Sequence, residues 1–412
     1  MPNKKLFQPM RLLRVIGTLD PAYGGPVEVS RHLNITLCQL GHRVDVVTLD
    51  GTDAPWITGF PGIVHSLGPS VGKYCYNRRL IPWLKAHSGD FDAVLVDGIW
   101  QFQSFGTWMA TRRDSPPYFV IVHGALDPWF KRAYPFKHIK KWLYWPWAEY
   151  RVLRDAQAVL FTCDEERILA RQSFWLYQVN EAIIDFGIPD PGGDPHGQRE
   201  KFFQSYPATR NKRLLLFLSR IHQKKGCDLL IEAFAMVAVR DPASHLVMAG
   251  PDQEGWQQKL VALAKVRGVE NRITWTGMLT GDTKWGAFHA AEVFILPSHS
   301  ENFGIAVAEA LACEVPVLIS SKVNISREIV QGGAGFAEPD TLDGTVALLE
   351  RWLGLSADEL HQMRNRSRAC FEDRFEIQQA AKKLVSVIEQ CLLARTGKVI
   401  PSGTVAGQDW NH

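Results

Sequence analysis

Cysteine is scarce and scattered in this sequence. None of the seven cysteines forms a Cys-x-x-Cys pair, and most lie within apolar runs, where the thiol packs as a small hydrophobic group. They are Cys38, Cys75, Cys163, Cys227, Cys313, Cys370 and Cys391. This pattern argues against a disulfide scaffold and favours a reducing compartment.

The sequence also lacks a long hydrophobic run. No segment approaches the roughly 20 apolar residues that a membrane-spanning helix needs. Lys4 and Lys5 lie near the N-terminus, but no apolar stretch with a small-residue cleavage site follows, and residues 11–20 have the pattern of a first β-strand. We therefore expect a cytoplasmic protein, bound at most peripherally to the inner face of the membrane.

Neither sign of charge is in large excess. The 46 Lys and Arg against 43 Asp and Glu give a formal charge of +3, which is too small to indicate nucleic-acid binding. No nucleic-acid-binding motif accompanies this charge, so no nucleic-acid partner is expected. A Gly-x-Gly-x-x-Gly fingerprint is also missing, which argues against a dinucleotide-dependent oxidoreductase.

What the sequence does have is a regular alternation of apolar strands and amphipathic helices. This order predicts an α/β fold with parallel sheets covered by helices on both faces, and 412 residues are too many for one compact domain. The expected strands are 12–18, 42–49, 92–98, 118–124 and 158–163, then 213–219, 245–250, 272–277, 293–298 and 315–320.

The Pro-, Gly- and charge-rich stretch 187–212 predicts a linker between two domains. We expect two Rossmann-like, doubly wound domains over 1–195 and 206–375 that face each other across a cleft. The helical run 376–395 is long enough to pack back onto the first domain, and residues 396–412 are expected to form a flexible tail.

The segment 297–310, PSHSENFGIAVAEA, has the strongest functional pattern. It follows a predicted strand, and a helix is expected to begin near Gly304, whose backbone N–H groups and dipole would suit a pyrophosphate. Glu309 falls on the same helical face as apolar residues, so its carboxylate is predicted to point inward. Its partner there is either a ligand hydroxyl, such as those of ribose, or a Lys or Arg in an internal ion pair. Taken alone, Glu301 is better interpreted as a solvated loop acid or a charge at the helix start.

The same segment closely resembles the Glu-x-Phe-Gly-x-x-x-x-Glu-Ala signature of the retaining glycosyltransferases of family 4, which have the GT-B fold. The resemblance implies that Glu301 contacts donor-sugar hydroxyls and that Glu309 holds the nucleotide ribose. Backbone N–H groups around Asn302, Phe303 and Gly304 would face the diphosphate and the sugar. The domain over 1–195 is then the acceptor side, and the domain over 206–375 binds the donor.

Arg220 and Lys225-Gly226 resemble a second element of this family, Gly-Arg-x-x-x-x-Lys-Gly, with Ser219 in place of the usual Gly. Departure of the diphosphate builds negative charge, which a guanidinium fork and an ammonium stabilise. Without the resemblance, both would be ordinary surface cations of a polar turn. Because these cations replace a metal, we expect no divalent ion and no cofactor besides the donor substrate; Asp252 and Asp282 lie in nearby loops.

Two further features lie at the ends of expected strands. Gly24-Gly25 resembles a family turn near the donor phosphate or the acceptor, although a tight structural turn has the same sequence. His123 ends a strand and would line the donor-sugar pocket, where the alternative is a hydrogen-bonded structural histidine; Asp127 follows it.

The remaining expected donor-binding residues are Gly250, at a strand end, and Met278 and Leu279, which would flank the base. A later loop departs from the family pattern. Residues 320–328, SSKVNISRE, keep Glu328 but lack the usual Gly-Gly pair, which puts a donor contact from this loop in doubt.

Residues 128–154 hold seven Lys or Arg, one acid and nine Trp, Tyr or Phe. Cations mixed with aromatic rings suit an anionic membrane surface; a core helix with Trp inward and Lys outward is the alternative. Pro146 argues against one continuous helix.

The resemblance thus predicts transfer of a hexose, with retention, from a UDP- or GDP-linked sugar to a saccharide or polyprenyl-linked acceptor, in the assembly of a bacterial-type exopolysaccharide or cell-surface glycan. The alternatives are a soluble transferase acting on a small sugar or sugar phosphate, and a catalytically silent nucleotide-sugar-binding partner.

Overall fold

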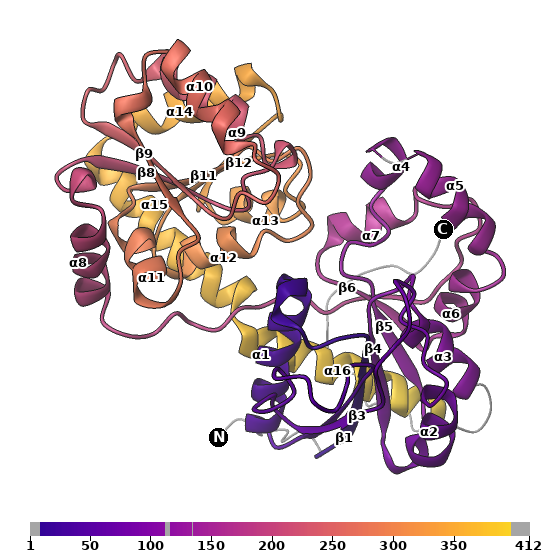
Figure 1. Ribbon diagram of the computed structural model, residues 1–412. Helices are drawn as coiled ribbons and strands as arrows, with labels where there is room; N and C mark the ends of the chain where they lie inside the picture. Colours follow the sequence, from indigo (N-terminus) through magenta and orange to yellow (C-terminus); the bar gives the residue numbers. More distant parts are fainter. Residues whose placement is uncertain (1–8, 112–115, 134, 397–412) are drawn as a thin grey trace.

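The computed structural model describes residues 9–111, 116–133 and 135–396, which form two α/β domains (Figure 1). Each domain has one parallel sheet with helices on both faces, as the alternation of apolar strands and amphipathic helices predicts. The predicted two-domain, doubly wound architecture is confirmed.

The first sheet has seven strands in the order β3-β2-β1-β4-β5-β6-β7. Its strands are β1 (Arg11–Ile16), β2 (Arg43–Thr48), β3 (Ile63–Ser66), β4 (Ala93–Asp97), β5 (Tyr118–Ile121), β6 (Ala158–Phe161) and β7 (Glu181–Ile183). The helices that accompany it are α1 (Gly25–Gln39), α2 (Leu80–His87), α3 (Phe102–Ala110), α4 (Trp129–Ala133), α5 (Pro135–Tyr144), α6 (Glu149–Asp155) and α7 (Asp164–Ala170). The order reverses between β1 and β4, the kind of point where such sheets bind ligands.

The second sheet has six strands in the order β10-β9-β8-β11-β12-β13, with its own reversal between β8 and β11. Its strands are β8 (Arg213–Leu218), β9 (Ser244–Ala249), β10 (Ile273–Gly277), β11 (Val293–Leu296), β12 (Val317–Ser320) and β13 (Gly335–Glu338). The helices are α8 (Pro195–Ser205), α9 (Cys227–Val237), α10 (Gln257–Val266), α11 (Gly281–Ala290), α12 (Ile305–Ala312), α13 (Ser326–Gln331), α14 (Leu342–Leu353) and α15 (Ala357–Cys370).

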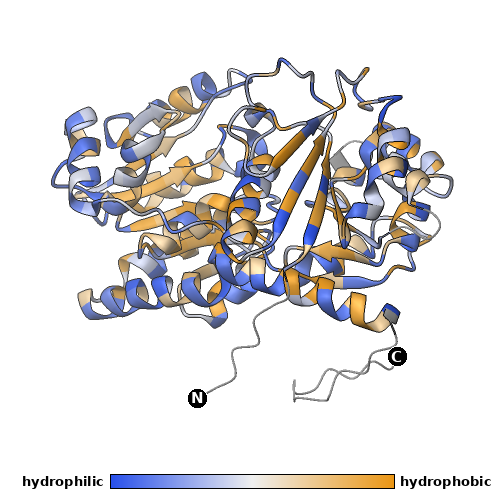
Figure 2. Ribbon diagram, turned by 90° about the horizontal axis from the view of Figure 1, so that it is seen from below, coloured by the Kyte–Doolittle hydropathy of each residue, from blue (hydrophilic) through white to orange (hydrophobic). Residues whose placement is uncertain are grey.

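The last helix, α16 (Ile377–Thr396), belongs to the first domain. Its apolar face, with Leu384 and Ile388, packs in one core with Leu12 of β1 and Phe119 of β5. In Figure 1 this helix (yellow) lies among the indigo and purple elements of the first domain. Figure 2 shows the apolar strands enclosed by helices. Apart from Thr396, the predicted tail lies outside the described residues.

Two expectations about secondary structure are wrong in part. Strands β3, β7 and β13 were not predicted, because they are short and mostly half-buried and therefore lack a continuous apolar run. The expected linker 187–212 contains α8, which Asp194 caps by accepting hydrogen bonds from the His196 and Gly197 N–H groups. Phe202 of α8 is fully buried in the second core, so only the first part of the stretch connects the domains.

The chain crosses between the domains twice at one place. The Ile188 N–H donates to the Phe375 carbonyl (2.9 Å), and the Ile377 N–H donates to the Ile188 carbonyl (3.0 Å). The two crossing segments therefore run together like a short parallel pair. Within the described residues, no helix is long and apolar enough to cross a membrane.

Candidate functional site

A cavity of about 700 Å³ lies where the carboxyl ends of the two sheets face each other. Both domains line it: residues 22–26 and His123 from the first, and Arg220, Lys225, Lys284, residues 301–306 and Glu309 from the second, with Phe186 from the first crossing segment. The structure thus brings together ten of the residues that the sequence singled out. They are Gly24, Gly25, His123, Arg220, Lys225, Glu301, Asn302, Phe303, Gly304 and Glu309.

The loop before α12 is fixed by its backbone. The Glu301 N–H donates to the Lys322 carbonyl (3.0 Å), and the Asn324 N–H donates to the Glu301 carbonyl (3.0 Å). The Ser298 hydroxyl donates to the carbonyl of Lys224 (3.0 Å), which ties the loop to the turn that carries Lys225. Ile305 and Ala306, the first two residues of α12, line the cavity, and as the first residues of a helix their N–H groups have no acceptor within it.

Glu301 and Lys225 form an ion pair at the cavity wall, with little of either side chain exposed. The ammonium and the carboxylate come from different loops, 76 residues apart. Each charge therefore has a partner before any substrate is bound, and each is positioned by the other.

Glu309 points inward as the helical periodicity predicts, and it is buried. Of the two partners considered for it, the structure contains the internal ion pair: the Lys284 ammonium donates to Glu309 Oε1 at 2.5 Å. Burial raises the pKa of the Glu309 carboxyl, while the charge and hydrogen bond of Lys284 oppose that rise. Lys284 lies on α11 and was not predicted, because nothing in its sequence context marks it as a partner of a residue 25 positions later.

Arg220 lies at the end of β8 and lines the cavity as an exposed side chain. Within the described part of the chain it makes no hydrogen bond or ion pair through its guanidinium. It is therefore available to an anionic ligand.

His123 sits at the end of β5 with φ of 49° and is nearly buried. Its Nε2 is 2.9 Å from Asp97 Oδ1, and Arg14 NH1 donates to Asp97 Oδ2 at 2.5 Å. Burial alone would raise the pKa of Asp97, but the charges and hydrogen bonds of Arg14 and His123 outweigh it, so the Asp97 pKa lies below its usual value. His123 is thus both hydrogen-bonded and part of the cavity wall. Arg14 is a charged residue in the middle of the apolar strand β1, and it is the feature of the sequence that could have indicated this network.

Three predicted donor residues do not line the cavity. Met278 is 70 % exposed, and Leu279 is buried in the second core. Gly250 is a glycine for a packing reason: its φ is 140°, and a Cβ there would lie 1.7 Å from the Ser219 carbonyl oxygen. Glu328, expected in a loop that departs from the family pattern, lies on α13 and is likewise absent from the cavity wall.

The domains touch around the site. Ser300 Oγ donates to Asp127 Oδ2 (2.9 Å), and Lys224 Nζ lies 4.4 Å from the centre of the Trp129 ring on α4. The Phe303 ring packs against Phe186, with centroids 4.5 Å apart, in the first crossing segment. The cavity wall also includes Lys284 and Gln253, which the sequence did not single out. Among the described residues, no group of three or more His, Cys, Asp or Glu is arranged to hold a metal.

Two family models match this chain. Residues 198–369 match the model described as Glycosyl transferases group 1, and residues 24–182 match the Glycosyl transferase 4-like domain. This chain belongs to the group 1 glycosyltransferases. The matched ranges fall on the second and first domains respectively, in agreement with the resemblance in the sequence.

Curated relatives of this glycosyltransferase match over less than half of their own length. The D-inositol 3-phosphate glycosyltransferase of Gordonia bronchialis is 29 % identical over 198 residues, which is 45 % of this chain and 42 % of the relative. The mannosylfructose-phosphate synthase of Agrobacterium fabrum is 28 % identical over 39 % of this chain and 40 % of the relative.

Solved structures share the two-domain fold along most of the chain. Sucrose-phosphate synthase from Thermosynechococcus elongatus has a TM-score of 0.72 at 18 % identity, covering 93 % of this chain and 100 % of that one. Anabaena Alr3699/HepE in complex with UDP has a TM-score of 0.74 at 17 % identity, covering 92 % and 100 %. At these identities the likeness shows the GT-B fold.

Proposed function

We propose that this glycosyltransferase moves a hexose from a nucleotide diphosphate sugar to a saccharide hydroxyl with retention of anomeric configuration. The observation that carries the proposal is one cavity wall with two carboxylate–lysine pairs and an unpaired arginine beside the start of α12. This set offers acceptors for sugar hydroxyls and donors for a diphosphate within one space.

In this proposal the diphosphate lies against the first turn of α12, with Arg220 and Lys225 on its oxygens. Glu309 accepts hydrogen bonds from the ribose hydroxyls, and Glu301 accepts them from the donor sugar. Entry of the donor then exchanges partners, because the lysines turn towards phosphate while the carboxylates turn towards hydroxyl groups.

The bond between the anomeric carbon and the phosphate oxygen breaks, and the acceptor oxygen bonds to that carbon on the same face. The acceptor proton passes to the departing phosphate oxygen. Arg220 and Lys225 stabilise the charge on this leaving group, so no divalent ion is required. His123, held by Asp97, positions the sugar and is not assigned as a base.

The donor base is proposed to be uracil, because Alr3699/HepE was solved in complex with UDP and with UDP-glucose. A thermal-shift screen of UDP- and GDP-sugars, followed by turnover and NMR of the product anomer, tests this proposal. Inversion at the anomeric carbon would refute the mechanism. Loss of turnover in excess chelator, with rescue by Mn²⁺, would refute metal independence.

For the acceptor we propose a lipid-linked saccharide on an anionic membrane surface. Helix α5 has no buried residue, and Phe136, Ile139 and Leu143 on one face are 83 %, 55 % and 61 % exposed. Lysines 137 and 140 lie on the same helix. In contrast, Trp145 between α5 and α6 is fully buried, as the core alternative requires. Tyr134 lies outside the described residues.

A sugar phosphate is the second candidate acceptor. It is favoured by the names of the relatives, a D-inositol 3-phosphate glycosyltransferase and a mannosylfructose-phosphate synthase. Turnover with polyprenyl-linked saccharides in vesicles, set beside turnover with inositol phosphate and fructose 6-phosphate in solution, discriminates the two. Turnover with the soluble acceptors alone would refute the lipid-linked assignment.

A further inference from the structure

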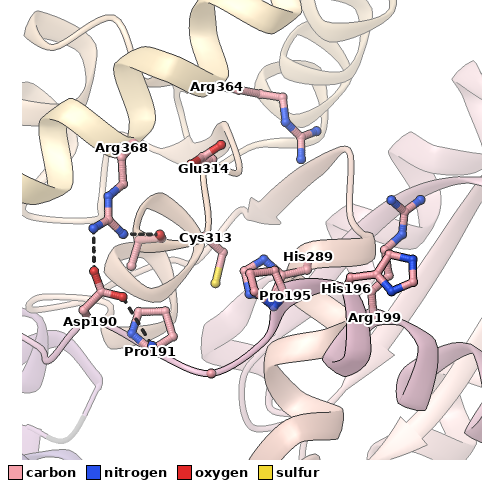
Figure 3. Close-up of a pocket in the computed structure, with 13 residues that line it drawn as sticks. Asp190, Pro191, Pro195, His196, Arg199, His289, Cys313, Glu314, Arg364 and Arg368 are labelled. Atoms are coloured by element: carbon pink, nitrogen blue, oxygen red, sulfur yellow. Dashed lines mark hydrogen bonds and ion pairs between the residues drawn. The ribbon is translucent and has the colours of Figure 1, made fainter.

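The cavity of about 700 Å³ between the domains, where the donor is proposed to bind, is called the donor cavity below. A second cavity, of about 480 Å³, lies at the opposite end of α12 (Figure 3). It is lined by residues 190–193 of the first crossing segment and by residues 312–314, at the C-terminal end of α12. Side chains from α8, α11 and α15 complete the wall. No described residue of this wall also lines the donor cavity, and the eight residues of α12 span about 12 Å between the two.

Two arginines reach into this space without an anionic partner in contact, although the guanidinium of Arg199 also lies 5.4 Å from the centre of the Phe203 ring. Arg199 comes from α8 and Arg364 from α15, and Figure 3 shows their guanidinium groups directed towards the same opening. Within the described residues, neither guanidinium makes a hydrogen bond or an ion pair. Arg364 is half-buried, and burial lowers the pKa of its guanidinium. The charges of Glu292 and Glu314 oppose this lowering, but neither carboxylate forms an ion pair with Arg364 in the described part of the chain. A bound anion in contact with the guanidinium would offset more of the cost of burying it.

The other ionisable groups of the wall are accounted for. Arg368 already has partners: it donates hydrogen bonds to Asp190 (2.5 Å), to Glu372 (2.7 Å) and to the Ala312 carbonyl (2.9 Å). Its positive charge therefore lies at the negative, C-terminal end of the α12 dipole. The carboxylate of Glu314 is exposed and faces Arg364 and His289 only at longer range.

His196, His289 and Cys313 complete the ionisable set, and burial raises the pKa of the Cys313 thiol, which is therefore neutral. Burial lowers the pKa of His289, and the charges of Arg364 and Arg199 lower it further against the opposing effect of Glu314. The imidazole is therefore neutral at physiological pH and can donate one hydrogen bond to an oxygen ligand. His196 is exposed at the start of α8.

We propose that this cavity binds the phosphate group of a small phosphorylated molecule between Arg199 and Arg364, separately from the donor diphosphate. Planar guanidinium groups match phosphate oxygens in pairs, and a cavity of this size holds a phosphorylated sugar beyond the phosphate itself. The ligand would bridge α8, α15 and the crossing segment, so it would join the segment between the domains to the donor domain. This inference does not depend on the proposed donor or acceptor.

Isothermal titration of the full chain with inorganic phosphate and with glucose 6-phosphate, at constant ionic strength, tests the site. The test variants are Arg199→Gln and Arg364→Gln, singly and together. Arg366→Gln is the matched control, because Arg366 lies exposed on the same helix and outside the cavity. Arg220→Ala/Lys225→Ala removes phosphate binding from the donor cavity.

Each test variant is expected to bind the probe at least about tenfold more weakly, while Arg366→Gln and the donor-cavity variant bind as the wild type does. Tighter binding of glucose 6-phosphate than of phosphate assigns a phosphorylated sugar, and the reverse assigns free phosphate. Equal thermal unfolding midpoints of the variants and the wild type would show that weaker binding does not come from a folding defect. If Arg364→Gln unfolds, Arg199→Gln still tests the site, because Arg199 is exposed. Binding lost only in the donor-cavity variant, or no saturable binding by the wild type, would overturn the proposal.

Discussion

Asp127 at the end of the first sheet accepts a 2.9 Å hydrogen bond from Ser300 on the donor-domain loop before α12. This bond joins the two domains beside Glu301, whose carboxylate lines the donor cavity. The domains are therefore held together at the point where donor and acceptor would meet, and the geometry of the loop depends on the first domain.

Asp127→Ala should lower kcat/KM by about tenfold or more, because a hydrogen bond to a charged group typically contributes about 1.5–3 kcal/mol. Steady-state kinetics measure this, and small-angle scattering should show a larger radius of gyration. The control is Glu165→Ala, which instead breaks an ion pair between the domains, to Arg327, whose side chain is 66 % exposed. Glu165→Ala should lower kcat/KM by less than about threefold. Equal effects of the two variants would contradict a specific role for Asp127.

Lys225→Ala should lower kcat by about 10²–10³, because it removes a cation from the leaving diphosphate in a site largely shielded from water. The variant also leaves Glu301 without its ion-pair partner, so the donor KM should change as well. Lys259→Ala, an exposed lysine on α10, is the control and should leave both constants unchanged. A kcat for Lys225→Ala within threefold of the wild type would remove Lys225 from the chemistry.

Glu309→Ala should abolish donor turnover while the thermal midpoint shows a folded chain. Lys284→Met should instead make donor binding depend on pH, because Lys284 is what opposes the raised pKa of Glu309. Without it the carboxyl pKa rises further, so Glu309 is protonated at low pH and regains its charge as pH increases. The donor KM of Lys284→Met should therefore fall from pH 6 to pH 9, more steeply than that of the wild type. Parallel profiles would be inconsistent with a carboxylate at the ribose.

Glu149 should make stability depend on pH. Burial raises the pKa of this carboxyl to about 7, although Ser104, the Trp100 N–H and Lys141 all favour its charged form. Between about pH 4.5 and pH 7 the folded chain therefore keeps a proton on Glu149 that the unfolded chain releases. The free energy of unfolding falls as pH rises through this range.

Urea unfolding measures this effect at pH 5 and pH 8. Between these pH values the free energy of unfolding of the wild type should fall by about 1–3 kcal/mol more than that of Glu149→Gln. The glutamine keeps a hydrogen-bond acceptor at this position but carries no charge. Glu254→Gln, at a side chain that is 67 % exposed, should follow the wild type. A Glu149→Gln curve parallel to the wild type would show that the Glu149 pKa is not raised.

The exposed face of α5 should bind anionic vesicles. The wild type is expected to float with phosphatidylglycerol vesicles at low salt, and Phe136→Glu/Ile139→Glu/Leu143→Glu should bind at least about tenfold more weakly. Val239→Glu, at an equally exposed apolar position on the second domain, is the control and should float as the wild type does. Absence of wild-type binding at low salt would defeat the membrane assignment.

Much of the fold could be predicted because most strands are continuous apolar runs, as in residues 213–218 and 293–296. The inward direction of Glu309 followed from helical periodicity alone. Its partner did not, because Lys284 reaches it through tertiary structure. Met278 and Leu279 lie outside the cavity wall, because distance in sequence from a strand end does not tell which way a loop turns. The cavity beside Asp190 is made by segments from four parts of the chain, and it left no local pattern.

Helix α16 has a consequence for how the chain is made. One face of the first sheet, including Leu12 and Phe119, is covered by residues 377–388, which leave the ribosome after the entire second domain. The second domain can complete its core as soon as Phe375 emerges, whereas the first waits with apolar strands uncovered. The domain whose synthesis begins first is therefore the one that finishes folding last, and a chain terminated before residue 377 should aggregate through its first domain.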